Sequence, residues 1–97
     1  MYRIVWTLEA SDDYISNIYY LENNFPESVV FSFIEQVDNV IRIIRTDPFV
    51  FRNSDFRDVH QVPVVPQITL FYRVTKSEEV VIVRFWNNYQ NKNRLKL

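Results

Sequence analysis

The spacing of apolar residues changes once along this chain, and the change divides it into a helical part and a stranded part. Between residues 30 and 44 the apolar side chains recur at intervals of three and four, the period of an α-helix with one buried face. They are Val30, Ile34, Val37, Ile41 and Ile44. From about residue 58 onward, apolar side chains alternate with others, as they do along β-strands. A chain of 97 residues has room for one core, so residues 1–97 are expected to form a single domain.

Signals at the ends of the helical part predict a short strand followed by two helices. Residues 2–6 alternate in polarity, and Thr7 is placed to cap a helix that ends at the two asparagines 23–24. Pro26 fits the first turn of a second helix, which Asp47-Pro48 stops. The connection between the helices is short, so they are expected to lie antiparallel.

Three antiparallel strands are expected in the second part, at residues 58–65, 67–74 and 79–86. Pro63 lacks a backbone N–H, which places the first of these strands at an edge of the sheet. The other two form a hairpin across a four-residue turn. The expected fold is therefore α+β: an N-terminal strand, a two-helix antiparallel hairpin and then a three-strand antiparallel meander, with the helices on one face of the sheet.

The alternation in the hairpin assigns its side chains to two faces. With an even number of residues in the turn, residues 68, 70, 72 and 74 of the first strand share a face with residues 81, 83 and 85 of the second. This face is apolar and is expected to meet the helices: Ile68, Leu70, Tyr72, Val74, Val81, Val83 and Phe85. The other face then mixes arginines with large apolar groups: Thr69, Phe71, Arg73, Val80, Ile82, Arg84 and Trp86. Because both helices are used on the first face, the second face is expected to stay uncovered and to meet a partner.

The charges are divided unevenly between the two parts of the chain. Residues 1–51 carry three basic and eight acidic side chains, a net charge of −5, whereas residues 52–97 carry eight basic and four acidic ones, a net charge of +4. One interpretation is that the two parts pack together and neutralise each other. The other is that the basic part forms a surface for nucleic acid or for an acidic protein.

Two residue types are missing, and their absence removes several classes of function. Phosphate-binding loops, dinucleotide fingerprints and the usual nucleophile elbow of serine hydrolases need glycine, which is absent. Cysteine is also absent, which excludes disulfide scaffolds, zinc ribbons and thiol nucleophiles. No apolar run approaches the ~20 residues of a membrane span and no signal peptide is apparent, so a cytoplasmic location is expected.

Metal chemistry and paired-carboxylate chemistry are both disfavoured. His60 is the only histidine and has no cysteine companion, so no metal site and no cofactor are expected. Asp12 and Asp13 are neighbours on the first helix and therefore point in different directions. They are better explained as solvated charges that the N-terminal helix dipole favours.

The basic part also holds aromatic side chains, a combination that suits RNA. Guanidinium groups bind phosphates and stabilise a pentacovalent transition state, rings stack on bases, and histidine or tyrosine moves a proton from a 2′-hydroxyl. The residues concerned are Arg57, Arg73, Arg84, Arg94, Lys92, His60, Tyr72, Tyr89 and Trp86. The same set suits an acidic protein partner, and any single arginine is also explained as a surface charge paired with a neighbour.

The chain resembles the RelE/ParE toxin family along nearly its whole length. The order of elements is similar, and so are the segments Leu70–Val74 and Val81–Asn87. Further matching positions are Trp6, Ala10, Asp13, Ile18, Phe33, Ile34, Pro48 and Arg57. The segment Phe85–Asn91 is similar to the FW-[DN]-x-RQNP ending of one branch of the family.

This resemblance implies the toxin of a bacterial type II toxin–antitoxin pair, neutralised by an antitoxin that lays an extended or helical segment over it. Some members of the family cleave mRNA on the ribosome, and others inhibit DNA gyrase. The basic and tyrosine side chains that the RNA-cleaving members use would fall here on Arg57, Arg73, Arg84 and Tyr89, with His60 as a further candidate.

The chain also departs from the branch that it resembles. His60, Gln61 and Pro66 stand where relatives often have basic residues, and Tyr89 stands where they have arginine. Each change removes a charge that would bind phosphate. These departures favour a gyrase-directed or inactivated toxin over a strong nuclease.

Three functions therefore remain open. The first is a toxin that inhibits growth by acting on DNA gyrase or on translation and mRNA, masked by an acidic antitoxin. The second is a non-toxic, decayed α+β protein-binding module. The third is a ribosome-dependent mRNA endoribonuclease that needs no metal and uses His60 or Tyr89 as proton carrier. For the first, the residues expected to bind target or antitoxin are Phe71, Ile82, Trp86, Lys92 and Arg94.

Overall fold

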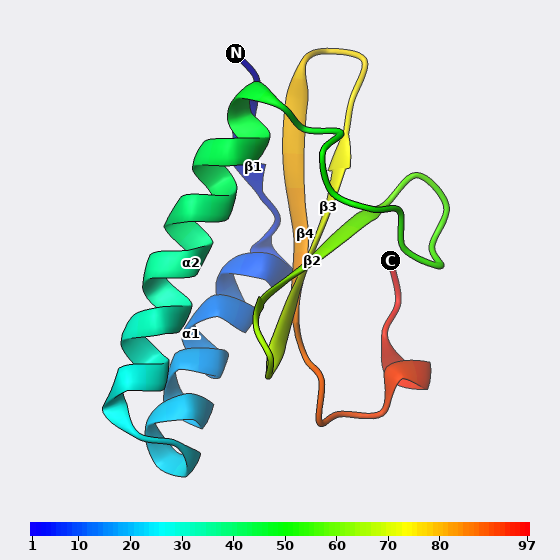
Figure 1. Cartoon of the computed structure of the whole chain (residues 1–97). Coiled ribbons are helices and arrows are strands. Elements are labelled where there is room, and N and C mark those ends of the chain that lie inside the picture. The colour runs from blue at the N-terminus through cyan, green and yellow to red at the C-terminus, as the bar shows by residue number, and fades with distance from the viewer.

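In the computed structural model, which describes residues 1–97, two helices pack side by side on one face of a four-stranded sheet (Figure 1). The elements, in chain order, are β1 (Arg3–Trp6), α1 (Leu8–Asn24), α2 (Glu27–Thr46), β2 (His60–Val65), β3 (Ile68–Val74), β4 (Glu79–Asn87) and a 3₁₀ turn (Lys92–Arg94). The α+β class and the position of the helices are as predicted. Neither helix has the length and apolar character that crossing a membrane requires.

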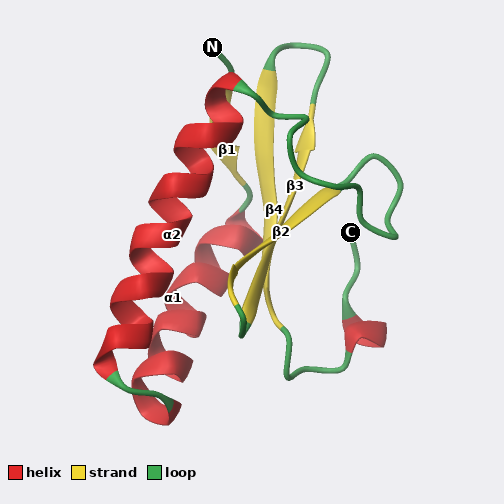
Figure 2. Ribbon diagram, in the orientation of Figure 1, coloured by secondary structure: helices red, strands yellow, loops and turns green.

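The sheet is mixed, because β1 joins it beside the last strand. The strand order is β1-β4-β3-β2, with β1 parallel to β4 and the other pairs antiparallel (Figure 2). The strand that contains Pro63 lies at an edge, as predicted, because a residue without an N–H is tolerated there. The three later strands form the expected meander, and the parallel β1 is an addition to it.

Both helices begin and end close to the predicted residues. The Thr7 side chain accepts a hydrogen bond from the backbone N–H of Ala10 and so caps α1. Pro26 immediately precedes α2, and Asp47 ends it. The two helices are antiparallel, joined by a two-residue turn (Figure 1).

The main core lies between the sheet and the helices. Its side chains that are shielded completely include Ala10, Leu21, Phe33, Ile44, Ile68, Leu70, Tyr72, Val80 and Ile82. The Tyr72 hydroxyl reaches the loop after α2 and donates to the carbonyl oxygen of Pro48 at 2.7 Å. Burial raises the pKa of Tyr72 to about 12, because the phenolate would lose its hydration there.

The pairing in the β3–β4 hairpin differs from the prediction near the turn. Val80 and Ile82 face the core, and Val81 and Val83 lie on the other side of the sheet. The cause is the turn, which closes with a hydrogen bond from Thr75 to Glu79 and therefore has three residues between paired ones. The third of these residues adopts a left-handed φ of 60°.

A β-bulge returns the later residues of β4 to their predicted faces, although their partners on β3 differ from the predicted ones. Tyr72 pairs with Ile82 but Phe71 pairs with Arg84, so Val83 has no partner on β3. The extra residue shifts the parity by one position. Phe85 therefore returns to the core face, where the sequence pattern had placed it.

The second face of the sheet is covered, contrary to the prediction. The segment after α2 and the C-terminal tail lie on this side (Figure 1), and they form a small second core. Its buried members are Val59, Phe71, Trp86 and Leu95. The apolar groups that seemed to need a partner are thus covered by the chain itself.

Candidate functional site

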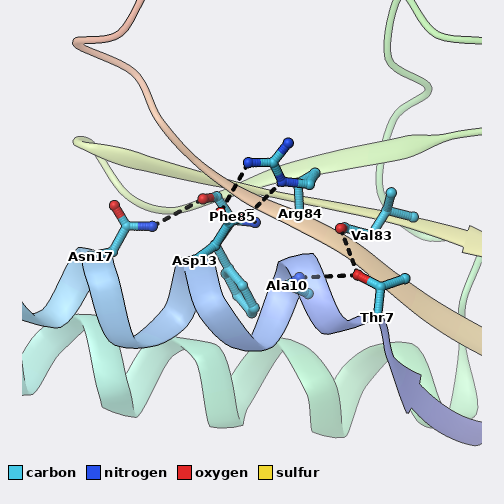
Figure 3. Close-up of polar contacts among 7 residues, drawn as sticks. All are labelled: Thr7, Ala10, Asp13, Asn17, Val83, Arg84 and Phe85. Atoms are coloured by element: carbon cyan, nitrogen blue, oxygen red, sulfur yellow. Dashed lines mark hydrogen bonds and ion pairs between the residues drawn. The ribbon is translucent and has the colours of Figure 1, made fainter. Parts of the chain in front are cut away.

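The most specific polar contacts join α1 to the edge of β4. Because β1 is only four residues long, the later part of β4 has no neighbouring strand on that side, and side chains of α1 and of its capping residue Thr7 take its place (Figure 3). Thr7 donates to the carbonyl oxygen of Val83, and Asn17 donates to that of Phe85, both at 2.9 Å. Asp13 accepts from the N–H of Phe85 at 3.0 Å. The exposed edge of β4 is thereby satisfied by a helix.

Asp13 also forms a two-pronged ion pair with Arg84 (Figure 3). Its Oδ2 lies 2.6 Å from Nε of Arg84, and its Oδ1 lies 3.0 Å from the second guanidinium nitrogen. The two side chains are only 16% and 23% exposed. This hydrogen-bonded pairing raises the pKa of Arg84, although its partial burial acts in the opposite direction. The prediction that Asp13 is a solvated helix-start charge is therefore wrong, whereas Asp12 is exposed as predicted.

The two candidate proton carriers lie apart. The His60 ring stacks on Tyr72 at 5.1 Å between centroids, and its Nδ1 lies 3.0 Å from the carbonyl oxygen of Phe51. Tyr89 is 67% exposed and stacks on Phe25 at 6.3 Å between centroids. His60 pairs with Tyr72 of β3, whereas Tyr89 follows Asn87, which pairs with Ile68 at the other end of that strand. Four residues of strand, or about 13 Å, therefore separate the places of His60 and Tyr89 along the sheet.

The remaining candidate arginines lie on three different segments of the chain. Arg57 is almost fully exposed, with Asp58 at 3.8 Å. Arg73 lies on the covered face of the sheet, opposite Val81, and is half-buried. Arg84 is held against α1, with its guanidinium carbon 5.5 Å from the centre of the Trp86 ring. The five predicted catalytic residues thus do not all meet, because His60 and Tyr89 are apart along β3 and Arg84 is paired with Asp13, whereas Arg73 directly follows Tyr72, on which His60 stacks.

Of the five predicted partner-binding residues, two are accessible. Lys92 and Arg94 are exposed in the tail, and Lys92 lies 3.7 Å from Asp55. Phe71 and Trp86 lie on the predicted face but are buried under the tail. Ile82 is in the main core, so its predicted face is wrong because of the three-residue turn.

A basic surface covers the second core. We call residues 52–59 and 92–97 the basic cover, because they carry five exposed basic side chains. These are Arg52, Arg57, Lys92, Arg94 and Lys96. Beside the cover is a groove of about 260 Å³ whose walls include Phe71, Trp86, Gln61 and Lys92. The groove has one charged residue in its walls, so it offers mainly aromatic and neutral polar contacts.

A second surface, which was not predicted, lies on the helices. Leu8, Ile15 and Tyr19 of α1 are more than half exposed, as is Phe31 of α2. The α1 residues follow one another at intervals of seven and four, which is helical spacing. This second apolar stripe was visible in the sequence beside the core stripe. No group of three or more histidine, cysteine, aspartate or glutamate residues is arranged to hold a metal ion anywhere in the chain.

Solved structures of other proteins share this fold. The structure is similar to one from the chromosomal ParDE toxin–antitoxin system of P. aeruginosa, with a TM-score of 0.72, 14% identity and coverage of 90% of this chain and 96% of that one. It is also similar to a YoeB/ParE toxin from Agrobacterium tumefaciens, with a TM-score of 0.64, 18% identity and coverage of 90% and 99%.

A third similar structure is the YoeB–YefM complex from Staphylococcus aureus, with a TM-score of 0.61, 14% identity and coverage of 92% and 99%. At these identities the likeness is one of fold. No curated protein sequence matches the chain significantly. The sequence itself matches the family described as "ParE toxin of type II toxin-antitoxin system, parDE" over residues 4–91. The chain therefore belongs to the ParE toxin family of type II toxin–antitoxin systems.

Proposed function

We propose that this ParE-family toxin inhibits growth by binding a protein target, DNA gyrase, and that a cognate antitoxin neutralises it in the cytoplasm. Family membership supports the toxin role. A complex of a similar toxin with its antitoxin, YoeB–YefM, supports a protein partner of that kind. The choice of gyrase over mRNA rests on the geometry of the candidate residues.

The observation that carries this choice is the separation of His60 from Tyr89, with Arg84 held by Asp13. General acid–base cleavage of RNA needs a proton carrier within about 3 Å of the reacting oxygen and a cation beside the phosphate. His60 lies beside Tyr72 of β3 and Tyr89 lies beyond the other end of that strand, so the two do not act as an acid and base pair on one phosphodiester. The guanidinium of Arg84 is already hydrogen-bonded to the carboxylate of Asp13. These positions support a toxin that acts by binding.

The basic cover is the surface that we propose for the target. Arg57 and Arg94 are exposed there, and Arg94 has no acidic partner. Exposed like charges gathered on one surface attract an acidic partner and speed its association. The cover is also well placed for contact, because it lies on the side of the sheet opposite the helices (Figure 1).

The test is to induce the protein alone in a bacterial culture and to follow incorporation of labelled thymidine and labelled methionine over the first minutes. Thymidine incorporation is expected to fall first, because gyrase inhibition blocks replication. If methionine incorporation falls first, the target is translation or mRNA, as in the ribonuclease hypothesis. If neither falls, the chain is a non-toxic binding module and the proposal is wrong.

Variants locate the surface in the same assay. Replacing Arg57 and Arg94 together by alanine is expected to relieve the arrest, whereas Lys76→Ala in the β3–β4 turn serves as an exposed control. Both variants change exposed residues and should leave folding intact. Arg84→Ala is unsuited to this purpose, because it leaves the half-buried Asp13 carboxylate without its cation. If the double variant is still fully toxic, the target does not bind at the basic cover.

A further inference from the structure

The outer side of α1 carries an apolar stripe that the fold does not use. Leu8, Ile15 and Tyr19 are 76%, 53% and 62% exposed. At 100° per residue they project away from the core side chains Ala10 and Leu21 of the same helix, and the 12 residues from Leu8 to Tyr19 extend over about 16 Å. Single exposed apolar residues need no explanation, but a row of three along one helix is a surface suited to another helix.

A hollow lies between the two helices at the end where they are joined. Its volume is about 270 Å³, and it is lined by Glu22 of α1 and by Glu27, Val30 and Phe31 of α2. Neither glutamate takes part in an ion pair. Apolar walls with two unpaired carboxylates fit the shape of a long basic side chain, whose stem packs on Val30 and Phe31 while its head meets the glutamates.

The charge of this region selects the partner. Residues 8–38 contain seven acidic side chains and no lysine, arginine or histidine. A second copy of the chain, placed symmetrically on the same surface, would oppose carboxylates to carboxylates, which is unfavourable. A partner that brings arginines or lysines beside its apolar face would be attracted instead.

We propose that this surface, which we call the helical face, binds a basic amphipathic helix. The apolar side of that helix packs on Leu8, Ile15 and Tyr19, and one of its arginines or lysines enters the hollow between Glu22 and Glu27. The inference rests on the proposed function for the identity of the partner, which is then a segment of the antitoxin. It differs from the expectation of an acidic antitoxin on the basic sheet face, because that face is covered by the chain itself.

The test uses two synthetic helical peptides of about 20 residues that share a leucine stripe at intervals of three and four. One has arginines beside the stripe, and the other has glutamates in their place. Each peptide is titrated into the full isotope-labelled chain while its amide NMR signals are followed. The arginine peptide is expected to shift signals of Ile15, Tyr19, Glu22 and Phe31, more weakly as salt is raised, and the glutamate peptide is expected not to bind.

Variants of the helical face sharpen this test. Glu22→Lys is expected to weaken binding of the arginine peptide by about tenfold, because an attractive charge becomes a repulsive one. Glu22 lies near the C-terminal end of α1, where a lysine is favoured by the helix dipole, so folding should not suffer. Ile15→Ser should weaken binding through lost apolar contact. The matched control is Glu78→Lys, exposed in the β3–β4 turn and outside the hollow, with less than about a twofold effect expected at a screened distance.

Three results would overturn the inference: equal binding of both peptides, shifts confined to the basic cover, or unchanged affinity of Glu22→Lys. A dimer of the chain that Ile15→Ser dissociates would also overturn it, since the stripe would then serve self-association. The proposed function is tested separately by growth arrest. If the chain binds the arginine peptide at the helical face but does not arrest growth, this inference stands and the proposed toxin mechanism is wrong.

Discussion

The helical face and the basic cover lie on opposite sides of the sheet and are built in different ways (Figure 1). The helical face is formed by two helices, its glutamates at the hollow form no ion pair, and its apolar residues are exposed to solvent. The basic cover is irregular, and its apolar residues are buried in a second core of four side chains. The opposite charges of the two halves of the chain are therefore sorted to opposite surfaces.

Mutual neutralisation of the two halves is only partial. Two ion pairs join them, Arg3 with Glu79 and Asp13 with Arg84. The other two, Arg57 with Asp58 and Lys92 with Asp55, lie within the basic half. Most charges of each half stay free for a partner, and the two surfaces are suited to partners of opposite sign.

The contact between the helical side and the sheet can be broken most strongly at Asp13. We expect Asp13→Ala to lower the free energy of unfolding by about 3 kcal/mol, because it leaves Arg84 and the N–H of Phe85 without their partner in a half-buried place. Urea unfolding measures this loss. The control is Asp12→Ala, whose exposed side chain should matter by less than about 0.5 kcal/mol. Equal effects of the two changes would mean that the contacts of Asp13 with Arg84 and Phe85 contribute little to stability.

A second contact that holds the sheet to the helical side is the hydrogen bond of Tyr72 to the loop after α2. Its pKa is raised by burial from 10 to about 12, so the folded state keeps the phenol neutral. Stability should be unaffected by this group below pH 10 and should fall as pH rises toward about 12, by roughly 2 to 3 kcal/mol. The free energy of unfolding is measured by chemical unfolding at roughly pH 9, 10, 11 and 12 in the wild type and in Tyr72→Phe, and the difference between the two proteins isolates this contribution. If both proteins lose stability in parallel, the loss arises from other groups.

The basic cover can be loosened without disturbing the helical face. Leu95 is 3% exposed in the second core, and Leu95→Ala should cost about 2 kcal/mol, the low end for a buried leucine, because the tail has few other contacts. Amide hydrogen exchange should speed up in the tail and stay unchanged in α1 and α2. Uniformly faster exchange throughout the chain would show that the two cores unfold as one unit.

The smallest effect is expected in the β3–β4 turn, outside both surfaces. Glu78 has a φ of 60°, which an asparagine adopts with less strain. Glu78→Asn should therefore raise the free energy of unfolding by about 0.5 to 1 kcal/mol. Lys76→Asn, in the same turn at a position with no positive φ, is the control and should give no such gain. A gain in both variants would point to the asparagine side chain itself in place of the backbone, because the two changes alter the charge in opposite directions.

The helices, the hairpin and the edge position of Pro63 were predictable because each depends on local rules of spacing, capping and missing donors. The faces of β4 were predictable only in part. Phe85 was placed correctly, but Val80 and Ile82 were not, because the three-residue turn and the bulge at Val83 each shift the parity. Such shifts depend on how two strands meet, and a single strand's pattern does not record them.

The candidate site was the least predictable part. Arginines at strand positions indicate charge but do not tell which carboxylate they will meet, and Asp13 lies 71 residues from Arg84. The covering of Phe71 and Trp86 depends on Val59 and Leu95, which come from separate segments. The stripe of Leu8, Ile15 and Tyr19 was visible in the spacing, and only the packing of α1 shows that it is the unused one.

The amino-acid sequence by itself determined the elements, their order and the unequal charge of the two halves, because these follow from short-range periodicity and from composition. Its resemblance to the RelE/ParE toxins also indicated the family to which the chain belongs. The tertiary structure decided which arginine is held in an ion pair, which aromatic groups are covered and which helix face is left open. Those outcomes depend on contacts between residues far apart in the chain, and such contacts form only when the layers pack.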